Sequence, residues 1–156
     1  RKNHFEKGTK MKKHKLYLVA VDGSEWGNRA ADHAIQTAKL TGAKVQLVTV
    51  VPWSGYQPLT VEEIVNRPIE KEHEEQRARE EILDPVLARH KDSGVEISSE
   101  LHWGHPVEVI RKQAKEEKAG QVFIGRRGRS RVADLILGSV ANSLAHSLGV
   151  PIVLVP

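Results

Sequence analysis

The feature that most constrains the fold is an alternation of short apolar runs with longer amphipathic stretches, which begins near Lys15 and continues to the end of the chain. Such runs are typical of strands buried on both faces, and the amphipathic stretches between them are typical of helices. This order predicts an α/β fold in which a parallel sheet carries helices on both faces. We therefore expect a single domain over residues 15–156, a length sufficient to bury its own core.

The predicted strands differ in how completely they should be buried. The first is continuously apolar, as expected of a central strand, whereas the third mixes polar with apolar residues, as expected of an edge strand. The expected strands are residues 16–21, 45–51, 95–101, 121–124 and 150–155.

Helices are predicted between these strands from capping residues and helical spacing. The first follows Ser24 and ends at Gly42, which can adopt a left-handed cap. A long charged helix is expected over about 67–92, with Pro68 near its first turn, an apolar side that includes Ile69, and a kink or interruption at Pro85. Two more helices are expected, one from Pro106 and one over 139–148, and the long connection 53–60 could form a flap.

Composition excludes several classes of protein. Because the chain has no cysteine, it has no disulfide, no Cys-ligated metal and no catalytic thiol. Its longest apolar run, residues 16–21, is far too short to span a membrane, and the polar N-terminal residues lack the apolar segment of a secretory signal. We therefore expect a cytoplasmic protein.

The net charge of +4 arises from the N-terminus. Residues 1–15 contain seven Lys and Arg but only one Glu, so the rest of the chain is slightly acidic. Residues 1–14 are expected to be a disordered tail or a remnant of production, because they have almost nothing to bury. Nucleic-acid binding is consequently not favoured, although the tail leaves it as an alternative.

The segment with the clearest chemistry follows the fourth predicted strand. Gly125 and Gly128 can approach an anion closely, and Gly138 with Ser139 stands at the head of the last helix, where free backbone amides favour phosphate. Four arginines, Arg126, Arg127, Arg129 and Arg131, add positive charge to this segment. Asp22 ends the first strand, and ligands of open parallel sheets bind beyond such strand ends. The spacing is neither that of a Walker loop nor that of a dinucleotide fingerprint.

At these residues the chain resembles the universal stress protein family, specifically its ATP-binding subgroup. The family pattern of Gly, two residues, Gly, nine residues, Gly and Ser or Thr is met by Gly125, Gly128, Gly138 and Ser139. Segments 19–24, 104–106 and 150–155 are also similar to the family, so the resemblance spans nearly the whole chain.

The resemblance implies an adenine nucleotide alpha hydrolase-like fold with strand order 3-2-1-4-5 and ATP or ADP, with Mg²⁺ brought by the nucleotide, in the cleft. It implies that Asp22 contacts the ribose or the phosphate and metal region, that Val50 or Val51 meets the adenine, and that the glycines and Ser139 hold the phosphates. The full set of nucleotide-binding residues that it implies is Asp22, Gly23, Val50, Val51, Gly125, Arg127, Gly128, Gly138, Ser139 and Val140. Ala141 departs from the family, in which Ser or Thr is common at this position.

The resemblance also implies a stress-linked regulatory module that acts on an unidentified partner. Strand five, Pro151 to Val155, is apolar and by the resemblance an edge strand, so we expect a homodimer through it. No residues pair a nucleophile with a base, so we expect no catalytic residue and at most slow ATP hydrolysis. Two alternatives stay open: an adenylyl- or phosphoryl-transferring enzyme of related architecture, and a nucleotide-independent dimeric scaffold.

Overall fold

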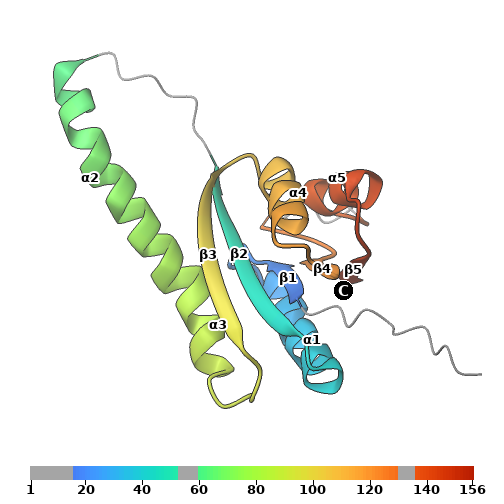
Figure 1. The fold of residues 1–156 in the computed structure, drawn as a ribbon. Helices are drawn as coiled ribbons and strands as arrows, with labels where there is room; N and C mark the ends of the chain where they lie inside the picture. The colour runs from blue at the N-terminus through green and yellow to red at the C-terminus, as the bar shows by residue number, and fades with distance from the viewer. Residues whose placement is uncertain (1–15, 53–59, 130–135) are drawn as a thin grey trace, which may run out of the picture.

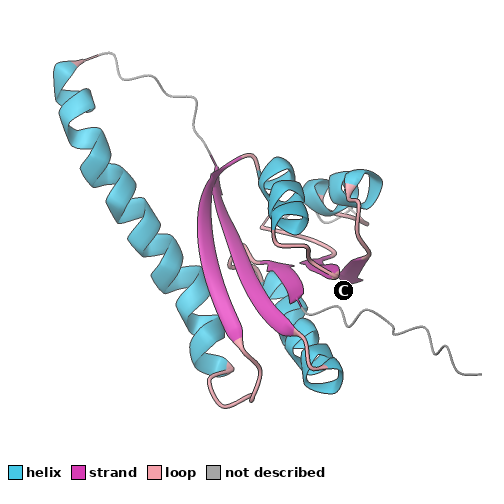
Figure 2. Cartoon of the chain, viewed as in Figure 1, coloured by secondary structure: helices cyan, strands magenta, loops and turns pink. Residues whose placement is uncertain are grey.

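The computed structural model describes residues 16–52, 60–129 and 136–156 and shows a five-stranded parallel sheet (Figures 1 and 2). The strand order is β3-β2-β1-β4-β5, which confirms the expected topology. The strands are β1 (Leu16–Ala20), β2 (Lys44–Pro52), β3 (Ile97–Gly104), β4 (Gln121–Gly125) and β5 (Ile152–Val155).

Helices cover both faces of this sheet and divide the core into two clusters. On one face, α1 (Glu25–Thr41) and the end of the long helix pack against strand residues such as Val19 and Phe123. On the other face, α4 (Pro106–Glu116) and α5 (Ser139–Ser147) pack against residues such as Leu18 and Val122. Successive strand residues alternate between the two clusters, as the pleat of a strand requires.

The ends of α1 follow directly from the sequence. The Ser24 hydroxyl accepts a hydrogen bond from the Gly27 N–H at 3.0 Å and so caps the first turn. The helix ends at Gly42, whose φ of 73° is the left-handed conformation that glycine adopts without strain. The buried face between these caps is mostly alanine, which lets α1 lie close to the sheet.

The long helix begins earlier than predicted. It runs through α2 (Val61–Ala78), the π-helical turn η1 (Arg79–Leu83) and α3 (Asp84–Arg89). Thr60 and Glu63 form a reciprocal capping box at its start, a signal present in the sequence that outweighs Pro68. Pro68 therefore lies inside the helix, not near its first turn as expected. Pro85, where an interruption was expected, follows the wider turn of η1.

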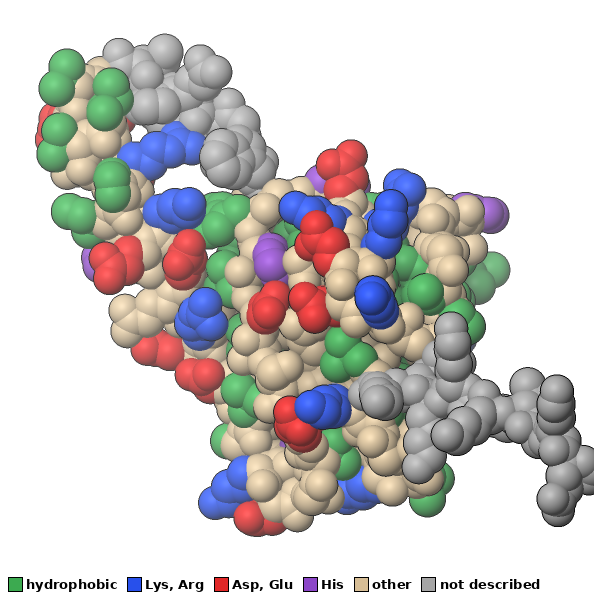
Figure 3. Space-filling model, viewed as in Figure 1, with side chains coloured by type: hydrophobic (Ala, Val, Ile, Leu, Met, Phe, Trp, Pro, Cys, Tyr) green, Lys and Arg blue, Asp and Glu red, His purple; other side chains and the backbone are tan. Residues whose placement is uncertain are grey.

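The two halves of this helix differ in burial. Leu83 and Val86 are fully buried against the sheet, whereas Ile69, predicted on the same apolar side, is 54% exposed. No residue of α2 is buried, and hydrophobic side chains gather at its projecting end (Figure 3). That placement of Ile69 was wrong because this part of α2 projects from the body, where no face of the helix is buried.

Trp103 at the end of β3 holds α2 beside the sheet. Its indole N–H donates a hydrogen bond of 2.7 Å to Glu75 Oε1, and the Lys71 ammonium lies 5.3 Å from the centre of its ring. These contacts fix the middle of α2, while the part that precedes Lys71 projects from the body (Figure 1).

Several predictions lie outside the described residues. These concern the tail over residues 1–14, the connection over 53–59 and Arg131. Among the residues that are described, no helix is long and apolar enough to cross a membrane.

Candidate functional site

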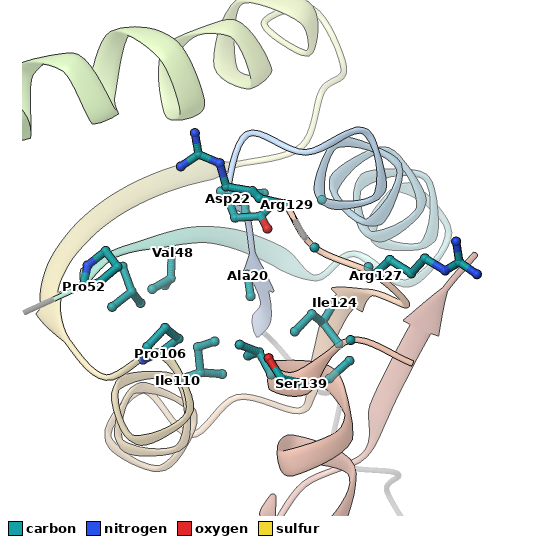
Figure 4. A pocket seen from close by; sticks show the side chains of 18 residues that line it. Ala20, Asp22, Val48, Pro52, Pro106, Ile110, Ile124, Arg127, Arg129 and Ser139 are labelled. Atoms are coloured by element: carbon teal, nitrogen blue, oxygen red, sulfur yellow. The ribbon is translucent and has the colours of Figure 1, made fainter. Parts of the chain in front are cut away.

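A cavity of about 460 Å³ lies beyond the carboxyl ends of β1, β2 and β4, against the first turns of α4 and α5 (Figure 4). The strand order reverses at this position, because β1 lies between β2 on one side and β4 on the other. A ligand is expected at such a position in an open parallel sheet.

One part of the cavity is apolar. β2 contributes Val48, Val50 and Pro52, which share a face of the strand because they are two residues apart. Pro106 and Ile110, one turn apart on α4, form the facing wall, and Ala20 and Ile124 complete this part from β1 and β4. Of these three residues only Val50 was predicted for the site; the alternation along β2 could also have identified Val48 and Pro52.

The other part of the cavity is formed by backbone and a few polar side chains. Asp22 follows β1, Gly128 follows β4, and Gly138 with Ser139 stands at the start of α5. The Gly138 N–H donates a 2.8 Å hydrogen bond to the carbonyl oxygen of Arg126, which joins the glycine loop to this helix. The N-cap of α5 is Gly138, which has no side chain to cap the helix, and Ser139, Val140 and Ala141 of the first turn line the cavity. Their backbone amides are therefore potential anion donors.

Gly125 is required for packing as well as for the cavity. A Cβ at this position would lie 2.6 Å from the Cβ of Trp26, in the first turn of α1. No side chain fits there, because real Cβ atoms essentially never approach another heavy atom so closely. Gly125 thus lets the start of α1 lie against the end of β4 and brings Asp22 beside the glycine loop.

The structure brings together most of the residues predicted for the site. The predicted residues that line the cavity are Asp22, Val50, Gly125, Arg127, Gly128, Gly138, Ser139 and Val140. Two others are not among its lining residues. Val51 points to the opposite face of β2 from Val50, and Gly23 adopts φ 81° in the turn that leads to α1, with Ile82 beside it.

The arginines contribute differently from one another. The Arg127 side chain extends away from the cavity, so its backbone forms the lining, and Arg129 is exposed at the rim (Figure 4). Arg126 is exposed and is not a lining residue. Ala141, the departure from the family pattern, is 2% exposed; it belongs to a core cluster and also lines the cavity.

Within the described residues, no group of three or more His, Asp and Glu side chains is placed to hold a metal ion. On β3, His102 Nε2 lies 2.9 Å from Glu100 Oε2. Asp22 is the one carboxylate among the lining residues that the structure describes.

Comparisons with known proteins agree on one family. The model of the universal stress protein family matches residues 15–156. A universal stress protein of Methanocaldococcus jannaschii is 29% identical over 145 residues, which cover 91% of this chain and 82% of that protein. The solved structure of hypothetical protein MJ0577 has a TM-score of 0.75 at 25% identity, with 91% of this chain and 95% of that chain covered.

A further solved structure is of a universal stress protein in complex with cAMP. It has a TM-score of 0.60 at 26% identity, and the match covers 91% of this chain and 96% of that chain.

Proposed function

The chain belongs to the universal stress protein family, and we propose that it binds ATP or ADP in the cavity at the ends of β1, β2 and β4. The observation that carries this proposal is the division of the cavity into an apolar part and a part lined by glycines and the first turn of α5. An adenine ring suits the first and a phosphate chain suits the second, because purine rings are largely apolar and phosphates bind free backbone amides.

The base would lie between β2 and α4. Val48 and Val50 offer one apolar surface, and Pro106 and Ile110 offer the other. The related universal stress protein solved with cAMP, an adenine nucleotide, supports this class of ligand.

The phosphates would lie against Gly128, Gly138 and the first turn of α5. Asp22 is acidic and would repel phosphate, so we assign it to a ribose hydroxyl or to a cation that accompanies the nucleotide. A Mg²⁺ ion fits only as a companion of the nucleotide, because a single lining carboxylate does not form a cage for it.

We propose binding without efficient turnover. Apart from backbone groups, the polar side chains that line the described cavity are those of Asp22, Arg129 and Ser139. None of these is a base beside a nucleophile, and hydrolysis needs a group that positions the attacking water. The nucleotide would therefore act as a signal that a regulatory partner reads, which is the stress-response role we propose.

We also propose a homodimer through β5. This strand ends the sheet, and Leu154 on it is 36% exposed. An apolar strand at the edge of a sheet favours pairing with a second copy.

The binding proposal is tested by denaturing freshly purified protein and identifying any released nucleotide by chromatography and mass spectrometry. The emptied protein is then titrated with ATP, ADP and AMP in a calorimeter, with and without Mg²⁺. Saturable binding of one molecule per chain supports the proposal. Absence of binding by all three nucleotides overturns it and favours the nucleotide-independent scaffold. Rapid turnover of ATP that requires an acceptor favours the transferase, with either the phosphoryl group on the acceptor and ADP released, or the adenylyl group on the acceptor and pyrophosphate released.

A further inference from the structure

The carboxylate of Asp22 is held by the residue two positions further along the chain. Its Oδ1 atom accepts hydrogen bonds from the Ser24 backbone N–H at 3.0 Å and from the Ser24 hydroxyl at 2.5 Å. The same hydroxyl oxygen accepts a hydrogen bond from the Gly27 N–H at 3.0 Å. Ser24 is 9% exposed and does not line the cavity, so it acts on the site through Asp22.

Two glycines leave room for this carboxylate, one beside each of its oxygen atoms. A Cβ on Gly27 would lie 2.9 Å from Oδ1 of Asp22, and a Cβ on Gly128 would lie 3.0 Å from Oδ2. Because Oδ1 is engaged by Ser24, Oδ2 is the oxygen that is directed toward the glycine loop. The carboxylate therefore has one fixed orientation before any ligand arrives.

We infer that Ser24 is a positioning residue, which orients the Asp22 carboxylate for the ligand, and that Gly27 provides the space this orientation needs. The inference rests on the proposed function, since it assigns a role to residues around the same cavity. Preorganisation of this kind raises affinity because the bound geometry does not have to be formed during binding.

Ser24 also caps α1, so the experiment must separate capping from positioning. Glycine is itself a good N-cap residue, so Ser24→Gly removes the hydroxyl that holds Asp22 while it largely preserves the helix. Ser24→Thr keeps the hydroxyl and serves as the matched control. Both variants are compared with the unchanged chain by titration with MgATP and by thermal unfolding.

We expect Ser24→Gly to weaken MgATP binding roughly tenfold, the change that corresponds to losing one hydrogen bond to a charged group. Ser24→Thr should stay within about twofold of the unchanged chain. The decisive measurement introduces Ser24→Gly into the Asp22→Ala variant. If Ser24 acts only by positioning Asp22, this second substitution should cause no further loss of affinity. An equal loss in both backgrounds, or no loss in either, would show that Ser24 only caps the helix.

Gly27→Ala tests the same inference with the opposite effect on the helix. Alanine favours a helix more than glycine does, yet its Cβ would displace the carboxylate of Asp22. We expect roughly tenfold weaker MgATP binding and recovery of that loss in the Asp22→Ala background. Full affinity in Gly27→Ala would overturn the inference. If the unchanged chain binds no nucleotide, the proposed function fails first and the inference fails with it.

Discussion

A Cβ on Gly128 would lie 3.0 Å from Oδ2 of Asp22, although the two residues follow different strands. Their proximity results from the parallel pairing of β1 with β4, which brings Ala20 beside Ile124 and ends both strands at the same edge. A side chain at position 128 would therefore require the Asp22 carboxylate, which comes from another strand, to shift by a few tenths of an ångström.

We predict that Gly128→Val abolishes nucleotide binding and that Gly128→Ala weakens it roughly tenfold, because the added carbon must displace either Asp22 or the loop. The matched control is Gly149→Ala, since a Cβ on Gly149 would meet no atom within 4 Å. Calorimetric titration measures the affinity of each of the three variants for ATP. Unchanged affinity in Gly128→Val would place the nucleotide elsewhere.

Neighbouring valines on β2 provide a second test, because Val50 lines the cavity and Val51 does not. Val50→Phe should fill the apolar part and weaken ATP binding at least tenfold, the effect of losing most of the contacts with the base. Val51→Phe adds the same bulk on the opposite face of the strand and should leave affinity within about twofold. Equal losses in both variants would indicate a general disturbance of β2 and contradict our placement of the base.

Sequence patterns predicted the strands well because burial on both faces leaves continuous apolar runs, as in Leu16–Ala20. Gly125, Gly128 and Gly138 could be selected as candidate site residues from the sequence because their spacing matches that of a known family. Sequence patterns did not show the wall formed by Pro106 and Ile110, since contact between α4 and β2 depends on how the helix packs on the sheet.

The start of the long helix was predictable in principle. Thr60 and Glu63 have the spacing of a capping box. The start was nevertheless predicted near residue 67, because proline is common in the first turn of a helix and Pro68 follows there. Which of two neighbouring signals determines a helix start depends on hydrogen bonds that composition does not reveal. The role of Ser24 was equally hidden, because a Ser before a helix is expected to cap it whether or not its hydroxyl also holds a carboxylate.

The stability of the fold should depend on Asp32 at acidic pH. Burial raises the pKa of this carboxyl, but hydrogen bonds and charges from Arg89 and His90 outweigh burial and lower the pKa below its ordinary value. Such a carboxylate stabilises the folded chain above its unfolded pKa, near 4, and this stabilisation is lost as the pH falls through the lower folded value.

We therefore predict that Asp32→Asn lowers the free energy of unfolding at neutral pH by about 1 kcal/mol or less, since the groups are partly exposed. Urea unfolding between neutral pH and pH ~3 measures the difference between variant and unchanged chain. That difference should shrink toward the acidic end. A constant difference over the range would show that packing, not charge, explains the effect.

Trp103 should control the opening of α2. Trp103→Phe keeps an aromatic ring but removes the N–H group that donates to Glu75 at 2.7 Å. Loss of this hydrogen bond should lower the local stability of α2 by about 1 kcal/mol. Amide hydrogen exchange over residues 61–78 should become several-fold faster, while exchange in α1 stays unchanged. Glu75→Gln, which retains an acceptor oxygen, is the control and should exchange nearly as slowly as the unchanged chain.

The proposed dimer is best tested at Leu154 and not at Val153. Both lie on β5, but Val153 packs against the core, so a charge there would damage the fold itself, whereas Leu154 is 36% exposed. Leu154→Lys should produce folded monomers in sedimentation velocity, because a lysine on an edge strand opposes pairing. The unfolding midpoint should fall only by the stabilisation that dimerisation supplies. Leu40→Lys changes a residue that is 89% exposed on α1 and should leave the dimer intact. A dimer that persists in Leu154→Lys would require an interface away from β5, and a monomeric unchanged chain would rule out the dimer altogether.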